Sequence, residues 1–286
     1  MTSHAQVVNG DVQLAAAGEH LNGGGPAVLL GHATGFCKEV WRPVVEDLAA
    51  TGLGIEVLSF DQRGHGGSSS FSKPLDWWDI ARDVLNVLDG RRGVIGVGHS
   101  SGGTALTLAE ILAPGTFRSL VLIEPIIPPP PFKRNDAEPM AVAALRRTRT
   151  FESRADAAQR FRGRGAFVGW DERAFTGYLD GGLCPDPYGD IDAVMLACHP
   201  QDEAEFFQTL SEHRAWSHLG EIDTPIELIA GEESESHPPR RLGLLTSRMQ
   251  LVTVTWVPRT NHFVPQQRPD VIAAAVAAAV SGEWAD

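Results

Sequence analysis

A short apolar run that passes through glycines into a helical pattern constrains this chain more than any other stretch. Residues 94–99 read Val-Ile-Gly-Val-Gly-His, Ser100 follows them, and a small, helix-compatible segment begins directly afterwards. The spacing Gly98-x-Ser100-x-Gly102 is typical of a nucleophile elbow, a strained strand-to-helix turn in which small neighbours let the backbone bend sharply. We therefore expect the Ser100 hydroxyl to face a cleft. The N–H of Ser101, at the start of a helix, should point to where an oxyanion would form.

The composition narrows the class of protein. Hydrophobic residues make up 43% of the 286 positions, enough to build the core of one large α/β domain with or without an inserted subdomain. The net charge of −12 argues against a nucleic-acid partner and against attraction to anionic membranes. The amino terminus lacks a secretory signal pattern and the alanine-rich run at 271–280 is too short to span a bilayer, so we expect a cytoplasmic protein. The three cysteines are scattered and are expected to be reduced: Cys37, Cys184 and Cys198.

Strand and helix patterns alternate along most of the chain. A hairpin is expected over residues 6–16, because an Asn9-Gly10 turn separates two short apolar runs. Further strands are expected at 27–30, 55–60, 94–97, 120–124, 225–231 and 251–257, and helices at 40–50, 76–88, 240–248 and 269–280. Repeated strand, helix, strand order with right-handed crossovers predicts an α/β fold with a doubly wound, mostly parallel sheet.

The alternation stops between residues 128 and 216, where the chain becomes arginine-rich and is broken by glycines. We interpret 128–216 as an inserted, mainly helical cap, with helical patches at 139–149 and 202–214, and residues 1–127 and 217–286 as the core. The aromatic side chains of this segment predict an apolar roof over a pocket, which favours a hydrophobic or aromatic acyl or alcohol group over a sugar or phosphate. They are Phe132, Phe151, Phe167, Trp170, Phe175, Tyr178, Phe206, Phe207 and Trp216.

Several motifs together resemble the α/β-hydrolase family over nearly the whole chain. In the family's order they are His32-Ala33-Thr34-Gly35, Asp61-x-Arg63-Gly64-x-Gly66-x-Ser68, Gly98-His99-Ser100-Ser101-Gly102-Gly103 and Asn261-His262-Phe263. The resemblance implies the α/β-hydrolase fold, a serine, histidine and acid triad under a cap, and no cofactor. No metal-binding spacing, P-loop or dinucleotide-binding glycine motif is present in the sequence.

A serine hydroxyl needs a base that is close to neutral itself, which points to histidine. His262 follows the last expected strand, where it resembles the family's base, and is the predicted base. His65 and His99 lie in glycine-rich turns and are expected to make structural hydrogen bonds, while His32 resembles the histidine that braces the oxyanion loop. The other histidines are interpreted as surface or cap residues: His4, His20, His199, His213, His218 and His237.

The acid departs from the usual family pattern. Most relatives have an aspartate three residues beyond the glycine that ends the strand after the cap, and counting from Gly231 this position is Ser234. Glu124 terminates an apolar strand at the edge where catalytic residues collect, and a carboxylate there is costly unless it is paired. Glu124 is therefore the predicted acid, with Glu235 as the alternative.

The resemblance also assigns the oxyanion hole and the reaction class. Its donors would be the backbone N–H groups of Thr34 and Ser101, although Ala33 stands where relatives usually have glycine; Asp61 and Arg63 are expected to brace their turn as a pair. We expect a serine esterase or lactonase that cleaves a small hydrophobic carbonyl substrate through an acyl-enzyme. Amide or carbon–carbon bond hydrolysis, acyl transfer and a non-catalytic ligand-binding role stay open as alternatives.

Overall fold

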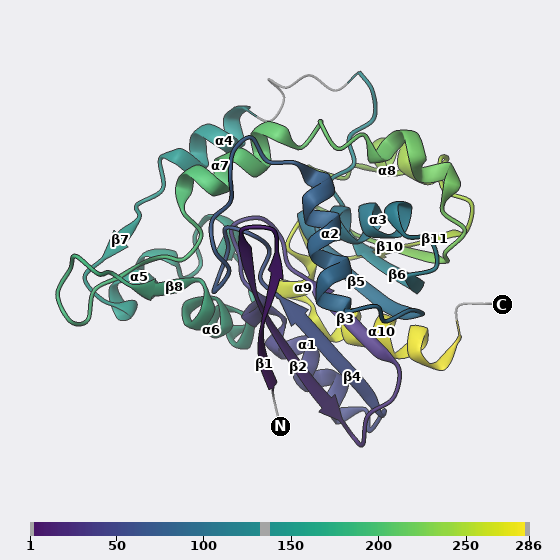
Figure 1. Ribbon diagram of the computed structural model, residues 1–286, viewed down its shortest axis with the longest axis horizontal. Helices are drawn as coiled ribbons and strands as arrows, with labels where there is room; N and C mark the ends of the chain where they lie inside the picture. The colour runs from purple at the N-terminus through teal and green to yellow at the C-terminus, as the bar shows by residue number, and fades with distance from the viewer. Residues whose placement is uncertain (1–2, 132–137, 284–286) are drawn as a thin grey trace.

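The structure is a computed structural model that describes residues 3–131 and 138–283. Its centre is an eight-stranded sheet in the order β1-β2-β4-β3-β5-β6-β10-β11, seen from one side in Figure 1. The strands are β1 (Ser3–Asn9), β2 (Val12–Leu21), β3 (Ala27–Gly31), β4 (Ile55–Phe60), β5 (Val94–His99), β6 (Phe117–Ile123), β10 (Ile226–Gly231) and β11 (Val252–Val257). From β4 to β11 every neighbouring pair is parallel, which confirms the predicted doubly wound α/β architecture.

The expected hairpin forms the antiparallel end of the sheet. β1 pairs with β2 in the register Asn9↔Val12, and β2 then pairs antiparallel with β4. Gly10 has φ of +63°, the left-handed conformation that a two-residue hairpin turn requires. The two loop residues are Gly10 and Asp11, one position later than the expected Asn9-Gly10 turn, because Asn9 still pairs with Val12.

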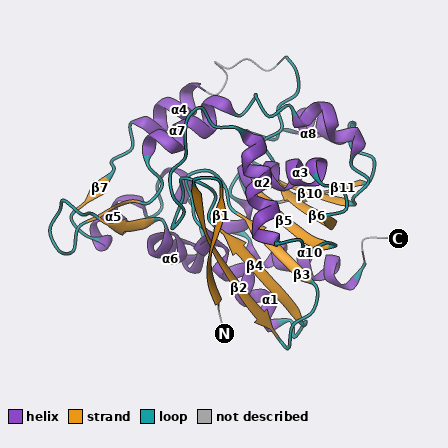
Figure 2. Ribbon diagram, viewed as in Figure 1, coloured by secondary structure: helices purple, strands orange, loops and turns teal. Residues whose placement is uncertain are grey.

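Helices cover both faces of the sheet, because its central strands are apolar on both sides (Figures 1 and 2). One face packs against α2 (Trp77–Leu88) and α3 (Ser101–Leu112), and the other packs against α1 (Arg42–Ala50) and α10 (Pro269–Ser281). α2 begins where the Asp76 side chain accepts a hydrogen bond from the Trp78 N–H at 2.9 Å. The remaining helical segments of the core are η1 (Lys38–Trp41), η4 (Ala215–Glu221), α8 (Pro239–Thr246) and α9 (Val264–Gln267).

The inserted region contributes helices and a separate small sheet. Its helices are α4 (Glu138–Leu145), α5 (Arg154–Phe161), η3 (Gly165–Phe167), α6 (Glu172–Gly181) and α7 (Pro200–Thr209). The sequence did not predict the antiparallel sheet β7-β9-β8, made of β7 (Thr150–Phe151), β8 (Leu183–Pro185) and β9 (Val194–Leu196). Strands of two or three residues are too short to show an alternating pattern. Phe132, one of the expected roof residues, lies outside the described residues.

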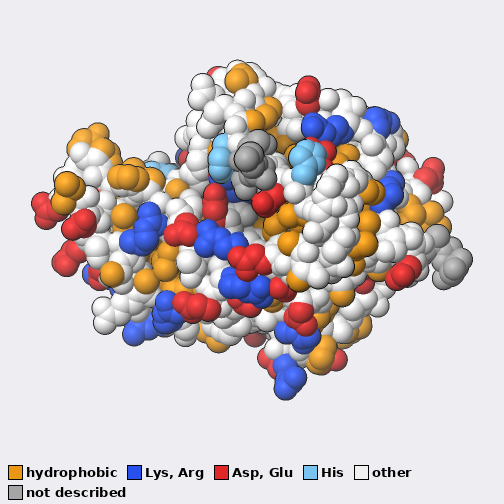
Figure 3. All heavy atoms as spheres, turned by 90° about the horizontal axis from the view of Figure 1, so that it is seen from below, with side chains coloured by type: hydrophobic (Ala, Val, Ile, Leu, Met, Phe, Trp, Pro, Cys, Tyr) orange, Lys and Arg blue, Asp and Glu red, His pale blue; other side chains and the backbone are white. Residues whose placement is uncertain are grey.

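The surface carries both signs of charge. In Figure 3, acidic and basic side chains are interspersed with apolar ones, and no single sign dominates the visible face. Among the described residues, no helix combines the length and apolar character that crossing a bilayer requires.

Candidate active site

The turn after β5 has the strained geometry that the sequence predicts. Ser100 adopts φ of 54° and ψ of −116°, a conformation that few side chains tolerate. A Cβ at Gly98 would lie 2.6 Å from the Gly103 Cα, and a Cβ at Gly102 would lie 2.2 Å from the Gly31 carbonyl oxygen. Only glycine therefore fits at both positions, and the bend is held by close contact between β5, α3 and β3.

Ser100 faces a large cavity. The cavity has a volume of about 1350 Å³, and its lining includes Ser100, His262 and the loop residues Thr34 and Ser101. Ser100 itself is buried, with only 6% of the residue exposed. Residues from β5, the loop after β3 and the loop after β11 thus meet at the carboxyl edge of the sheet, where ligands bind in open α/β folds.

His262 contacts the carboxylate of Glu124. The Nδ1 of His262 lies 2.6 Å from Glu124 Oε2, and the carboxylate is fully buried while 23% of the imidazole is exposed. A proton on Nδ1 leaves Nε2 of the ring unprotonated, which is the form that can act as a base. The backbone carbonyl of His262 accepts a hydrogen bond from His99 Nε2 at 2.8 Å, which holds the loop in place.

Glu124 is held by polar groups from the loop after β10. The N–H of Gly231 donates to Oε1 at 2.9 Å, and the hydroxyls of Ser234 and Ser236 both donate to Oε2 at 2.7 Å. Ser234 therefore occupies the position of the usual aspartate and hydrogen-bonds to the carboxylate of the neighbouring strand. The buried charge of Glu124 has partners on both oxygens, as a buried carboxylate requires.

Two histidines control the ionisation of the carboxylate. Burial would raise the pKa of Glu124, but its contacts with His237 and His262 outweigh burial and hold this pKa well below its usual range. Glu124 is consequently ionised throughout the neutral pH range, so it can stabilise an imidazolium at His262.

Two buried histidines brace the loop that carries Thr34. His32 donates from Nδ1 to the Ala33 carbonyl at 2.8 Å and accepts at Nε2 from the Gln62 N–H at 3.0 Å. His65 accepts at Nε2 from the Gly35 N–H at 2.9 Å. Burial lowers the pKa of His32 to about 4 and the pKa of His65 to about 3, so both rings are neutral at pH 7.

The bracing leaves backbone donors available at the cavity. Within the described part of the chain, neither the Thr34 N–H nor the Ser101 N–H is hydrogen-bonded to another residue. Gly35, directly after Thr34, has φ of +81°, which turns the loop sharply at this point. Both predicted oxyanion donors therefore lie unpaired at the cavity that Ser100 lines.

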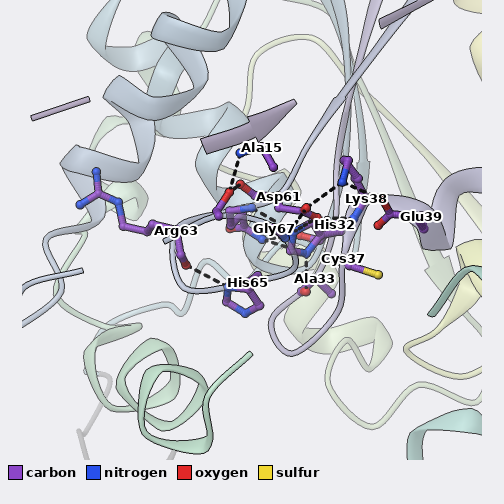
Figure 4. Close-up of polar contacts among 12 residues, drawn as sticks. Ala15, His32, Ala33, Cys37, Lys38, Glu39, Asp61, Arg63, His65 and Gly67 are labelled. Carbon is purple, nitrogen blue, oxygen red and sulfur yellow. Dashed lines mark hydrogen bonds and ion pairs between the residues drawn. The ribbon is translucent and has the colours of Figure 1, made fainter. Parts of the chain in front are cut away.

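The expected pairing of Asp61 with Arg63 is wrong. Asp61 instead accepts from the N–H of Lys38 at 2.7 Å, from Lys38 Nζ at 2.9 Å and from the Gly67 N–H at 2.9 Å, as Figure 4 shows. Arg63 points away from Asp61 and forms a two-pronged pair with Asp83 of α2, at 2.7 and 2.8 Å. Both residues brace their turn, but each does so through a partner distant in the sequence.

The interpretation of His237 as a surface or cap residue is also wrong. His237 belongs to the loop between β10 and α8, only 2% of it is exposed, and its Nδ1 lies 3.4 Å from Glu124 Oε2. The sequence signal was its place in a polar run after a buried strand, at the sheet edge where catalytic residues collect. Glu235, the alternative acid, is exposed and lines the cavity, and no hydrogen bond or ion pair among the described residues joins it to His262.

The cavity wall is mostly apolar and aromatic. Of the cap aromatics singled out from the sequence, Phe167, Phe206 and Phe207 line it. Further lining aromatics are Phe36, Trp77, Phe161 and Phe263. Five arginines also line it: Arg147, Arg160, Arg164, Arg240 and Arg241.

The described residues include one cluster with metal-ligand chemistry, made of Glu124, His237 and His262. Its atoms already bond to one another, because His262 Nδ1 lies 2.6 Å from Glu124 Oε2 and the Ser236 hydroxyl contacts both. The cluster is therefore a hydrogen-bonded network, which does not fit a resident metal ion.

Solved structures share the overall fold of this chain. Peroxisomal alpha-beta-hydrolase Lpx1 from Saccharomyces cerevisiae superposes with a TM-score of 0.79 at 19% identity, covering 99% of this chain and 88% of that one. The thioesterase domain from the curacin biosynthetic pathway gives a TM-score of 0.79 at 20% identity, with 97% and 99% of the two chains covered.

One relative is more similar in sequence than either of these solved structures, but it is much longer than this chain. Type I acyl-CoA thioesterase mpaH of Penicillium roqueforti is 28% identical over 195 residues, which are 57% of this chain and 42% of the relative. The chain thus matches less than half the length of this relative. The model of the Alpha/beta hydrolase family matches residues 12–275, nearly the whole chain. The chain belongs to the alpha/beta hydrolase family.

Proposed function

We propose that the protein is a serine hydrolase that cleaves a carboxylic ester, lactone or thioester with a hydrophobic acyl group. The observation that carries this proposal is the shared cavity of Ser100 and His262, with Glu124 bonded to the far side of the imidazole at 2.6 Å. This arrangement supplies a nucleophile, a base and an orienting acid in the roles that acyl transfer needs.

The reaction follows from these roles. His262 Nε2 takes the proton of Ser100 as its oxygen attacks the carbonyl carbon, and the N–H groups of Thr34 and Ser101 stabilise the oxyanion. The tetrahedral intermediate collapses, the leaving alcohol or thiol receives the proton from His262, and the acyl group stays on Ser100. A water molecule that gives its proton to His262 then attacks the acyl-enzyme and releases the acid. Glu124 remains ionised and holds the imidazolium in place.

The size and lining of the cavity favour a substrate larger than the small molecule expected from the sequence. A volume of about 1350 Å³ exceeds that of most pockets for drug-sized ligands. The aromatic wall suits an extended acyl chain or an aromatic acyl group. Amide and carbon–carbon bond hydrolysis remain alternatives that use the same triad.

The arginines favour a leaving group that carries negative charge. Arg164 and Arg240 are exposed at the cavity, and in the described structure neither forms an ion pair with a carboxylate. Unpaired guanidinium groups suit phosphate or carboxylate. The mpaH relative is named an acyl-CoA thioesterase, and a coenzyme A thioester combines an apolar acyl chain with phosphates. We therefore include thioesters of phosphate-bearing thiols among the proposed substrates.

Covalent labelling tests the nucleophile, and hydrolysis of a model ester tests the reaction class. A fluorophosphonate probe is expected to modify the wild type at Ser100 and to leave Ser100→Ala unmodified, with thermal unfolding as the check on folding. The wild type should hydrolyse p-nitrophenyl butyrate and Ser100→Ala should not. Turnover retained by Ser100→Ala would contradict the proposal, as would absence of labelling in the folded wild type.

Arginine variants test the leaving group. Arg164→Gln and Arg240→Gln are expected to raise KM for hexanoyl coenzyme A by about 5- to 30-fold each, the effect of losing about 1–2 kcal/mol of charged hydrogen bonding. KM for neutral p-nitrophenyl butyrate should not change. Arg248→Gln is the matched control, since Arg248 is exposed and does not line the cavity. Equal KM values for hexanoyl coenzyme A in all variants would contradict the anionic leaving group.

A further inference from the structure

A second histidine contacts the same carboxylate oxygen as the first. The ring of His237 is parallel to that of His262, with an interplanar angle of 12° and centroids 6.5 Å apart. Its Nδ1 lies 3.4 Å from Glu124 Oε2, the oxygen that His262 contacts. Two imidazoles thus lie against one carboxylate oxygen, and of the two only His262 lines the cavity.

We propose that His237 is a positioning residue that holds Glu124 in line with His262. The proposal rests on the proposed function, because it assigns His237 a role only through the triad. His237 touches no substrate, and its effect passes through the carboxylate and the neighbouring Ser236 hydroxyl.

The hydrogen bonds of the ring show how it would do so. The Nε2 of His237 lies 3.0 Å from the backbone carbonyl of Pro125, and since a carbonyl only accepts, Nε2 carries the proton. This bond ties the loop after β10 to the residue that follows Glu124. A neutral ring then carries no proton on Nδ1, which lies 3.2 Å from the oxygen of Ser236, whose proton is donated to Glu124 Oε2.

Ser236 links the two rings through the acid. Its hydroxyl oxygen lies 2.7 Å from Glu124 Oε2 and 2.9 Å from His262 Nδ1. Because the His237 ring packs against this hydroxyl and against Glu124 Oε2, it restricts the position of the carboxylate that His262 contacts. A glutamate has one more rotatable bond than the aspartate it replaces, so its alignment needs more restraint.

Burial favours a neutral ring at His237, against the charge of Glu124. Glu124, at the end of β6, raises the pKa of His237, while burial, His262 after β11 and Arg241 of α8 lower it. Burial is the largest of these effects and the net shift is downward. At neutral pH the ring is uncharged, so it acts through shape and hydrogen bonding.

Three variants separate positioning from simple structural support. His237→Phe keeps a planar ring and loses both nitrogens. His237→Gln places an amide N–H near the position of Nε2 and keeps the bond to Pro125, while His237→Asn is too short to reach it. His218→Phe is the control, since His218 is partly exposed, contacts Glu221 and the Trp78 ring, and does not line the cavity.

The expected result is a loss in kcat with KM unchanged. His237→Phe should lower kcat by about 10- to 100-fold, the range seen when outer partners of active-site ligands are removed. The acid limb of kcat/KM should move to lower pH, because a poorly aligned carboxylate stabilises the imidazolium less. His237→Gln should restore most of kcat, whereas His237→Asn should resemble His237→Phe.

Other outcomes would overturn the inference. If His237→Phe folds and keeps kcat and the pH profile of His218→Phe, His237 is not a positioning residue. An acid limb that moves to higher pH would show that the ring acts through its charge. If His237→Phe fails to fold, equal kcat in the Gln and Asn variants overturns the inference. Activity retained by Glu124→Gln would instead overturn the triad itself, so the two failures can be told apart.

Discussion

Replacing Glu124 by glutamine is the sharpest test of the triad, because the surroundings dictate how the new amide must lie. The N–H of Gly231 donates to Oε1 and cannot rotate, so the amide oxygen of the glutamine has to occupy this position. The NH₂ group then faces Ser234, Ser236 and His262. The two hydroxyls can rotate to accept, but His262 can accept only if its Nδ1 loses the proton.

The expected loss of kcat follows from this change of tautomer at His262. With the proton moved to Nε2, the imidazole can no longer accept the proton of Ser100. The equivalent acid-to-amide change in a serine protease triad lowers kcat by about 10⁴-fold, or about 5 kcal/mol of transition-state stabilisation. We expect a loss of the same order in Glu124→Gln. The fold should persist, because Gly231 keeps its acceptor and the two protons of the NH₂ group can be donated to two of its three neighbours.

Steady-state hydrolysis of p-nitrophenyl butyrate measures the effect, with burst kinetics to separate acylation from deacylation. Glu235→Gln is the matched control, since it changes an exposed glutamate of the same cavity that makes no described contact with His262. Its kcat should stay within about twofold of wild type. A Glu124→Gln enzyme within about tenfold of wild type, or a Glu235→Gln enzyme that loses activity, would refute the reasoning.

Two further predictions concern stability. Gly98→Ala brings a Cβ to 2.6 Å from the Gly103 Cα and should lower the free energy of unfolding by about 1–3 kcal/mol in urea, whereas Gly220→Ala, with its nearest atom at 3.6 Å, should not. Acid should destabilise the fold below pH 6.5, because four buried histidines stay neutral when folded but take up protons when unfolded. As the pH falls, each lowers the free energy of unfolding by about 1.4 kcal/mol per pH unit until its folded pKa is reached. These pKa values are about 4 for His32 and His213 and about 3 for His65 and His99. A stability independent of pH between 6.5 and 5 would contradict this linkage.

The strands and the elbow could be predicted from the sequence because their signals are local. The turn at Gly10, the apolar runs of β3 and β5 and the glycines around Ser100 each determine the backbone within a few residues. The short strands of the β7-β9-β8 sheet carry no such signal, since pairing partners far along the chain create them.

The polar contacts of the site were harder to predict because they join distant segments. Arg63 pairs with Asp83, twenty positions away, where the sequence suggested Asp61, two positions away. Glu124 was identifiable because a carboxylate that ends an apolar strand needs a partner, and the structure places His262 against it. His237 follows a buried strand, but nothing local shows that its loop folds back onto the residue after Glu124.

The position of Glu124 also ties the inserted region to the sheet. Pro125 and Ile126 alone separate Glu124 from Ile127, the last residue assigned to the core from the sequence. The Ile126 carbonyl accepts from Thr104 of the elbow helix at 2.9 Å and from His213, after α7, at 3.1 Å. The chain is therefore anchored just before it leaves the sheet, and the far end of the inserted region returns to the same carbonyl. Any rearrangement of this region that keeps both hydrogen bonds leaves the carboxylate of Glu124 in place.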